Sequence, residues 1–150
     1  MNEVRVNGAW VAAVRQRTIS TDGIVAVLDR LGTAFGDRDV ATALSCFVAD
    51  DDITYVGSEF GEAAAGHVLV GALLARAFAR PEAYSWRVRQ SRVHRYGDCA
   101  YVLAEADGEV VTDTGEQSRF PYRISGVLEP GEDGWRIRVC HGCEPTPPST

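Results

Sequence analysis

The sequence lacks several features that would place it in a common functional class. Its 150 residues contain no run of about 18 apolar residues, so we expect no transmembrane helix and no membrane partner. Basic residues are too few for nucleic-acid binding, which needs a basic patch, because the net charge is -6 and the pI is near 5.0. Residues 1–17 are too polar for a secretory signal peptide. These absences together predict a cytoplasmic protein.

The short motifs of several enzyme classes are also missing. The chain has no phosphate-binding loop, no nucleotide-binding fingerprint and no activated serine. Cys140 and Cys143 have the C-x-x-C spacing that occurs in redox and zinc sites. However, residues three apart on a regular strand point to opposite faces, and no second cysteine pair or paired histidine completes a zinc site. We therefore expect no metal and no cofactor, and a redox or metal role for this pair is the less favoured alternative.

What the chain does have is the composition of an ordinary globular protein, with 45% hydrophobic and 24% charged residues. Its length predicts a single domain over residues 1–150, with a core from about residue 20 to about residue 145. Arginine clusters between Arg87 and Arg95, which we interpret as a solvated strand face because the overall charge is acidic. The aspartate run from Asp50 to Asp52 indicates an acidic loop rather than a metal site.

The first half of the chain predicts helices. Residues 22–35 carry apolar side chains at helical spacing, after residue types that favour the N-cap position. A second, shorter helix follows Asp39, and a third spans residues 67–80, where Pro81 ends it. His67 falls in the first turn of the third helix, which favours solvent exposure. A further short amphipathic helix could be formed near the N-terminus by Trp10, Val11 and Val14.

The rest of the chain predicts strands, because apolar and polar residues alternate with a period of two between turn signals. The alternation changes phase near Gln90, which predicts a β-bulge. Asp107 and Gly108 indicate a turn. Helices followed by long strands joined by tight turns predict an α+β fold. The predicted strands are residues 53–58, 83–95, 99–106, 119–129 and 134–145.

The last predicted strand carries a histidine at the end of an apolar row. Trp135, Ile137 and Val139 share one face by alternation, and His141 has the same parity. If the apolar residues face the interior, His141 faces it too, either as a satisfied core residue or as a polar group at the bottom of a pocket. The other two histidines lie at a helix start and beside a turn, so His141 is the favoured functional histidine.

Several segments of the chain match those of a known superfamily. They are residues 47–59 (FVADDDITYVGSE), the helix after Gly66, residues 85–106, residues 122–137 (YRISGVLEPGEDGWRI) and residues 141–145 (HGCEP). On these segments the chain resembles the nuclear transport factor 2-like superfamily and, within it, the SnoaL-like proteins. The resemblance covers residues 22–145, most of the sequence.

This resemblance implies a conical barrel, in which three helices from the N-terminal half pack in a curved, mainly antiparallel β-sheet. The wide end of the cone would hold a pocket for a small apolar organic ligand, and the outer face of the sheet would form a homodimer. The superfamily includes ketosteroid isomerases, polyketide cyclases, epoxide hydrolases, dehydratases and noncatalytic modules. The fold alone therefore does not identify the reaction.

The catalytic residues of two of these enzyme classes have no match at the corresponding positions. The catalytic tyrosine of steroid isomerases roughly aligns with Asp29, their general base falls near Tyr55 or Val56, and their protonated aspartate falls near Ser125. The epoxide hydrolases need two aspartates bridged by an arginine, but no aspartate follows Arg123 two residues on. The final motif of related proteins usually reads HGSEP, and Cys143 replaces its serine.

The polar residues on the predicted strands make a different candidate site. His141 and Glu105 are predicted as a general acid–base pair. Burial in the cone would raise the pKa of Glu105 and a nearby Arg123 would lower it, so the distance between the two decides whether Glu105 is ionised. Tyr55 is a further candidate catalytic residue. Each of the four has a structural alternative in packing, surface ion pairs or backbone hydrogen bonds. The predicted substrate-binding residues are Trp86, Trp135, Phe35, Phe78 and Glu59.

Two classes of function follow from these residues. The favoured hypothesis is an enzyme that performs acid–base chemistry, of the isomerase, cyclase or dehydratase type, on an apolar substrate in the cone. It predicts an enclosed polar cluster. The alternative is a noncatalytic ligand-binding or dimerisation module, which predicts a cone filled with side chains or an apolar patch on the outer sheet face.

Overall fold

The computed structural model describes residues 22–149 of the chain. The helices in this range are α2 (Asp22–Asp37), α3 (Val40–Ser45) and α4 (His67–Phe78). The strands are β1 (Thr54–Val56), β2 (Ala63–Ala65), β3 (Ala83–Tyr96), β4 (Cys99–Val111), β5 (Gln117–Gly131) and β6 (Gly134–Cys143). The helix considered near Trp10, Val11 and Val14 lies outside the described residues.

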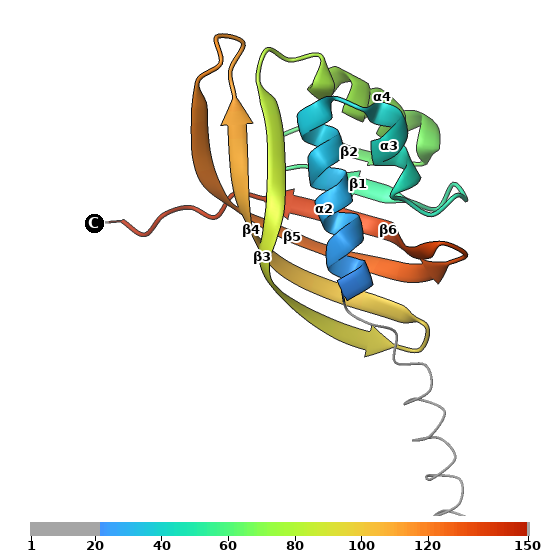
Figure 1. Ribbon diagram of the computed structural model, residues 1–150. Helices are drawn as coiled ribbons and strands as arrows, with labels where there is room; N and C mark the ends of the chain where they lie inside the picture. The colour runs from blue at the N-terminus through green and yellow to red at the C-terminus, as the bar shows by residue number, and fades with distance from the viewer. Residues whose placement is uncertain (1–21, 150) are drawn as a thin grey trace, which may run out of the picture.

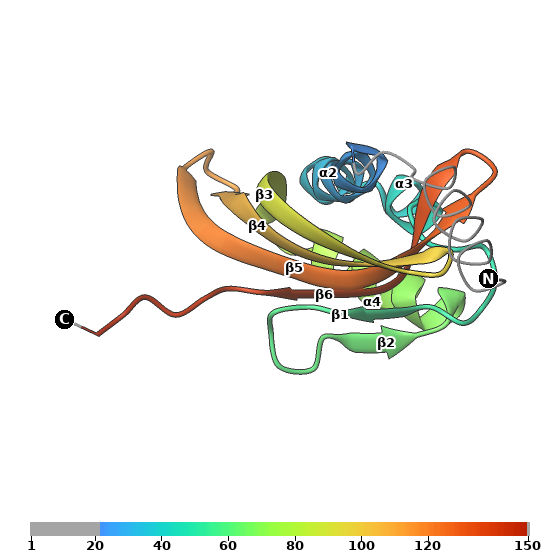
Figure 2. The same cartoon turned by 90° about the horizontal axis from the view of Figure 1, so that it is seen from below.

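The strands form one six-stranded sheet in the order β2-β1-β6-β5-β4-β3. Neighbouring strands are antiparallel, except that β1 and β6 run parallel. Figure 1 and Figure 2 show that the sheet curls without closing and that α2 lies on its concave side. The structure confirms the predicted α+β cone, with three helices packed in a curved, mainly antiparallel sheet.

α2 packs its apolar stripe tightly against β3. Ile24 and Leu31 on this stripe are fully buried. Gly32 is the point of closest approach, because a Cβ there would lie 2.8 Å from Trp86 Cδ1 and would clash with the Trp86 carbonyl oxygen. The Trp86 indole donates a hydrogen bond from Nε1 to the Leu28 carbonyl oxygen at 3.0 Å. These contacts fix the distance between helix and strand.

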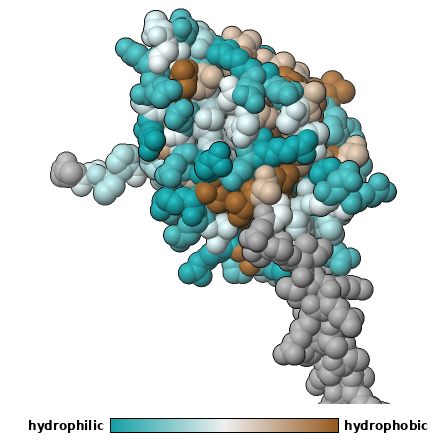
Figure 3. All heavy atoms as spheres, viewed as in Figure 1, coloured by the Kyte–Doolittle hydropathy of each residue, from teal (hydrophilic) through white to brown (hydrophobic). Residues whose placement is uncertain are grey.

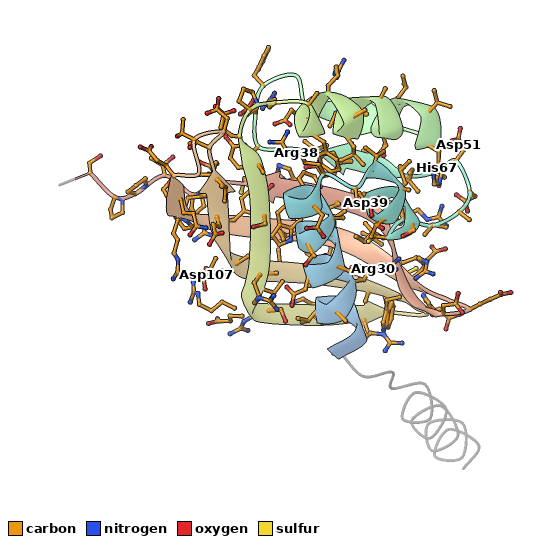
Figure 4. All side chains as sticks on the ribbon, turned by 45° about the horizontal axis from the view of Figure 1, so that its top comes forward. Arg30, Arg38, Asp39, Asp51, His67 and Asp107 are labelled. Atoms are coloured by element: carbon orange, nitrogen blue, oxygen red, sulfur yellow. The ribbon has the colours of Figure 1, made fainter. Side chains whose placement is uncertain are left out.

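α2 continues beyond its predicted end at Phe35 and stops before Arg38. Arg38 has a left-handed conformation with φ 57°, which costs a non-glycine residue about 1 kcal/mol. Its guanidinium offsets this cost by donating hydrogen bonds to the carbonyl oxygens of Phe78, Arg80 and Pro81 at 2.7, 2.7 and 3.0 Å. Figure 4 shows Arg38 between the end of α2 and α4. The side chain therefore joins the ends of the two helices.

β4 runs through the turn predicted at Asp107 and Gly108, so that prediction is wrong. The ring of Phe120 on β5 occupies the space that a Cβ of Gly108 would fill. The glycine therefore serves close packing within a strand rather than a turn. The β-bulge predicted near Gln90 is confirmed by a register shift between Val88 and Gln90.

The acidic loop before β1 is held in place by hydrogen bonds. The Asp51 Oδ1 atom accepts the backbone N–H of His67 at 2.8 Å, at the first turn of α4. The His67 Nε2 atom is 2.8 Å from the Val48 carbonyl oxygen, and His67 is half-buried rather than solvent-exposed as predicted. Figure 4 shows Asp51 and His67 together at the start of α4. The loop and this histidine thus have structural partners.

No helix within residues 22–149 is long and apolar enough to cross a membrane. The face seen in Figure 3 is largely polar, with apolar atoms over α4 and across the middle of the face. Val68 and Leu69 on the outward side of α4 are 83% and 61% exposed. These two side chains do not contribute to the core.

The close approach of Gly32 to Trp86 predicts that a glycine-to-alanine substitution in α2 destabilises the protein, the opposite of the usual effect in a helix. Glycine-to-alanine changes inside a helix normally stabilise it by about 1 kcal/mol. We expect Gly32→Ala to lower the free energy of unfolding by about 1–3 kcal/mol instead, because the added methyl group overpacks the contact with Trp86. The measurement is the denaturant midpoint. Thr33→Ala, at the exposed next position, is the control and should leave the midpoint nearly unchanged. A gain in stability for Gly32→Ala would contradict this packing.

Candidate functional site

A second β-bulge, which the alternation pattern did not predict, reverses the orientation of the end of β6. Leu128 pairs with Ile137 and Val127 pairs with Val139, so Arg138 has no partner on β5. Residues after the bulge change faces. His141 is therefore exposed on the outer face, and its predicted place inside the cone is wrong.

The extra residue of this bulge is held by acidic groups. The Arg138 guanidinium contacts both carboxylate oxygens of Glu129, at 2.6 and 3.1 Å. It also donates to the Asp50 carboxylate and, at 2.8 Å, to the carbonyl oxygen of Asp52. The bulge thus ties β6 to β5 and to the acidic loop, which gives the aspartate run a structural role.

Glu105 and Arg123 also lie on the outer face of the sheet, not in the cone. Glu105 forms ion pairs with Arg89 at 3.3 Å and with Arg123 at 3.6 Å. The side chains of Glu105 and Arg123 are 44% and 58% exposed. The reason is that Ala104 and Ala106, on either side of Glu105, point inward and are buried. The predicted acid–base pair in the cone is therefore wrong, although both of its members line one hollow on the outer face.

The structure instead gathers most of the predicted aromatic residues around one pocket at the wide end of the cone. Phe35, Phe78 and Trp86 line it, together with Tyr55 and Glu59. Its volume is about 60 Å³, far below the roughly 300–1,000 Å³ of pockets that enclose drug-sized ligands. Side chains thus fill most of the cone, and the remaining space opens to solvent at the rim.

The walls of the pocket are a continuous set of packed rings. The Phe35 ring centroid lies 4.7 Å from that of Trp86 and 4.9 Å from that of Phe78. Trp86 stacks on Tyr122 at 5.3 Å, and the Phe120 ring stands edge-on to Tyr122 at 5.9 Å. Offset and edge-on rings stabilise one another beyond simple burial. The walls are therefore firmly positioned.

Trp135 is separate from this pocket. It is 3% exposed, which confirms its predicted place in the core. However, it lies beside the first turn of α2, where a Cβ on Gly23 would be 2.9 Å from its Cδ1 atom. The Arg95 guanidinium carbon is 5.3 Å from the Trp135 ring centroid. Trp135 and Trp86 thus pack along different parts of α2, and only Trp86 lines the pocket.

Two buried tyrosines line the pocket. Tyr55 and Tyr122 are 3% and 7% exposed. Burial raises the pKa of the Tyr55 hydroxyl well above its ordinary value, and Tyr122, Cys140 and Glu62 add to the shift. Burial likewise raises the pKa of Tyr122, with further contributions from Cys140 and Glu62. Both hydroxyl groups therefore stay protonated near neutral pH.

The rim of the pocket is rich in carboxylates. Glu59 forms an ion pair with Arg80 at 2.7 Å, and the Glu62 Oε1 atom accepts the backbone N–H of Glu59 at 2.9 Å. Glu82 and Glu144 complete the acidic rim. Within residues 22–149, no group of three or more histidine, cysteine or acidic side chains is arranged to hold a metal ion.

Several pocket residues were not selected from the sequence. The alternation of residues along β5 did place Phe120 and Tyr122 on the same face as Ile124 and Leu128. Tyr122, Ile124 and Leu128 are all buried, which confirms that they share the inner face. Only the curvature of the sheet brings this face opposite the loop that carries Glu62.

A second hollow lies on the outer face of the sheet. It has a volume of about 450 Å³. Glu105, Arg123 and His141 line it, together with Leu103 and Cys143. The residues predicted as an acid–base cluster are thus near one another, but on the side of the sheet away from α2.

Comparisons with known proteins agree with this architecture. The sequence pattern of the SnoaL-like domain matches residues 24–147. A candidate dehydratase of the NTF2-like family from Streptomyces avermitilis is 17% identical, with a TM-score of 0.70 over 85% of this chain and 97% of that one. An NTF2-like superfamily protein from Salmonella enterica is 16% identical, with a TM-score of 0.67 over 86% and 93% of the two chains.

ActVI-ORFA from Streptomyces coelicolor is similar to the same degree. It is 18% identical, with a TM-score of 0.66 over 82% of this chain and 95% of its own. No curated protein matches the sequence significantly. Identities this low show that the fold is NTF2-like and do not transfer an activity.

The two faces of β6 predict different reactivity for its cysteines. Cys140 is buried, and burial raises its pKa to about 12, so almost no thiolate is present at pH 8. Cys143 is only partly buried, on the outer face. We expect a disulfide-exchange reagent to label Cys143 in the native protein and to label Cys140 only after denaturation, as read by peptide mass spectrometry. Equal labelling rates in the native state would contradict the bulge at Arg138.

Proposed function

We propose that this chain, which belongs to the SnoaL-like domain family, binds a small organic molecule in the aromatic pocket. The observation that supports this most directly is the pocket itself. Rigid rings surround a space that opens to solvent, and a small number of polar groups lie at its floor and rim. Apolar walls with a few convergent polar groups are typical of ligand sites.

The pocket supports binding better than it supports acid–base catalysis. A general acid or base works best when its pKa is near the operating pH. The Tyr55 and Tyr122 hydroxyl groups have pKa values raised away from neutrality, so they serve as hydrogen-bond donors and acceptors. The Glu62 carboxylate lines the same pocket and adds to the raised pKa of both phenols.

The size of the pocket limits the ligand. A volume of about 60 Å³ has room for a small head group or a single short chain. A polycyclic molecule would need the rings of Phe35, Trp86 or Tyr122 to move. Trp86 and Tyr122 belong to the core cluster, and Phe35 packs against it. We therefore propose a small ligand, or a larger one with only one end enclosed.

A matched pair of substitutions on α4 tests the pocket. Ala77 lines it, whereas Ala75 is exposed on the opposite side of the helix. We expect Ala77→Leu to weaken fragment binding about tenfold or more by filling the space, and Ala75→Leu to leave it unchanged. The readout is a fragment screen by NMR that follows the indole N–H of Trp86, with that of Trp135 as an internal control. Binding that shifts only the Trp135 signal, or that survives Ala77→Leu, would exclude this pocket.

We also propose a homodimer that forms through the outer face of the sheet. Leu103 and Tyr101 are 45% and 38% exposed on this face. Around them, Glu105 lies between Arg89 and Arg123. A surface that carries both signs of charge beside apolar side chains can match its own copy about a two-fold axis. The hollow of about 450 Å³ would receive side chains of the partner.

The oligomeric state gives the test of the homodimer. Light scattering at micromolar concentration should return twice the chain mass of 16.2 kDa. We expect Leu103→Glu to yield a 16.2 kDa monomer, because it buries an unpaired charge in the interface. Leu69→Glu, on the outward face of α4, is the control and should remain a dimer. A monomeric parent protein would contradict the proposal.

A further inference from the structure

The rim of the aromatic pocket carries more negative than positive charge. Four carboxylates line the pocket, and only two guanidinium groups, those of Arg38 and Arg80, accompany them. Glu82 and Glu144 form no hydrogen bond or ion pair with the other described residues. Their charges are therefore available to a ligand at the mouth.

The two arginines already donate hydrogen bonds within the protein, which makes them less available to an anionic ligand. Arg80 pairs with Glu59 at 2.7 Å. Arg38 donates to three carbonyl oxygens at the C-terminal end of α4. This end is the negative pole of the helix dipole, which partly compensates the Arg38 charge. A carboxylate or phosphate ligand would face four carboxylates and only two guanidinium groups, both with hydrogen-bond partners in the protein.

The electrostatic influence of the rim reaches into the pocket. Partial burial raises the pKa of Tyr84, and the carboxylates of Glu59, Glu82 and Glu144 add to this shift. Tyr84 lines the pocket next to Phe120, with ring centroids 6.0 Å apart. The negative potential is therefore felt at an aromatic ring on the wall.

Aromatic faces and carboxylates favour the same kind of ligand. The face of an aromatic ring is electron-rich and attracts a cation within about 6 Å of its centroid. From the ring-lined space, the acidic rim and the engaged arginines, we infer that the pocket takes a small organic cation, an amine or quaternary ammonium group. The inference rests on the proposed binding function and specifies the chemical class of its ligand. The cationic head would lie among the rings of Tyr84, Trp86 and Phe120, and the carboxylates would attract it to the mouth.

A pair of probes of equal shape separates charge from size. 3,3-Dimethylbutan-1-ol has the shape of choline but carries a neutral carbon atom in place of the ammonium nitrogen. By calorimetry or NMR titration at low salt, we expect choline to bind the intact chain at least about tenfold more tightly than the neutral alcohol does. Tyr84→Phe, which keeps the ring, should preserve this preference, and Tyr84→Leu should reduce it.

The double variant Glu82→Gln/Glu144→Gln tests the rim without breaking a described contact. We expect it to weaken choline binding about threefold to tenfold and to leave binding of the neutral alcohol unchanged. Glu132→Gln, on the exposed β5–β6 hairpin, is the matched control and should change neither.

The outcomes distinguish this inference from the function on which it rests. Equal or tighter binding of the neutral alcohol at the pocket would overturn the cation inference and leave small-molecule binding intact. Choline binding that is insensitive to the double variant would also overturn it. If neither probe binds and the fragment screen also finds no ligand at the pocket, both proposals fail.

Discussion

The close contact between α2 and β3 sets how the curled sheet packs around the helix. At Gly32 the helix comes within contact distance of the backbone and ring of Trp86, and the Trp86 indole is hydrogen-bonded to Leu28 one turn away. A buried hydrogen bond and a close glycine contact together allow little freedom in the spacing of helix and strand. The sheet therefore curls around a helix whose position is fixed, and the size of the remaining space at the wide end follows from it.

The same aromatic residues serve stability and the proposed site. Trp86 stacks on Tyr122 and packs against Phe35, and all three line the pocket. A wall built from core residues is rigid, because its rings are already fixed by packing on their other sides. A rigid wall reduces the entropy lost on binding, which favours a small ligand that makes few contacts. Substitutions in this wall will affect folding and binding together.

Charge is distributed differently on the two sides of the sheet. Outside, Glu105 forms ion pairs with Arg89 and Arg123, so charges of opposite sign compensate locally. At the mouth of the pocket, Glu82 and Glu144 lack such partners within the described residues. Exposed pairs contribute little to stability, whereas uncompensated charge beside a low-dielectric space acts over a longer range. Uncompensated negative charge is therefore present at the mouth of the pocket.

The sequence by itself determined the α+β class, the helices, the long strands and the bulge near Gln90, because these depend on local periodicity and turn chemistry. It also selected Tyr55, Trp86 and Phe35 as candidate site residues, and all three line the pocket. Only the tertiary structure decided which face His141 occupies. The bulge at Arg138 is held by Glu129 and by Asp50, and Asp50 lies far away in the chain, so alternation along β6 could not reveal it. The carboxylates of the acidic rim likewise come from separate loops and strand ends, which meet only when the sheet curls. A pattern of neighbouring residues in the sequence therefore could not predict this rim.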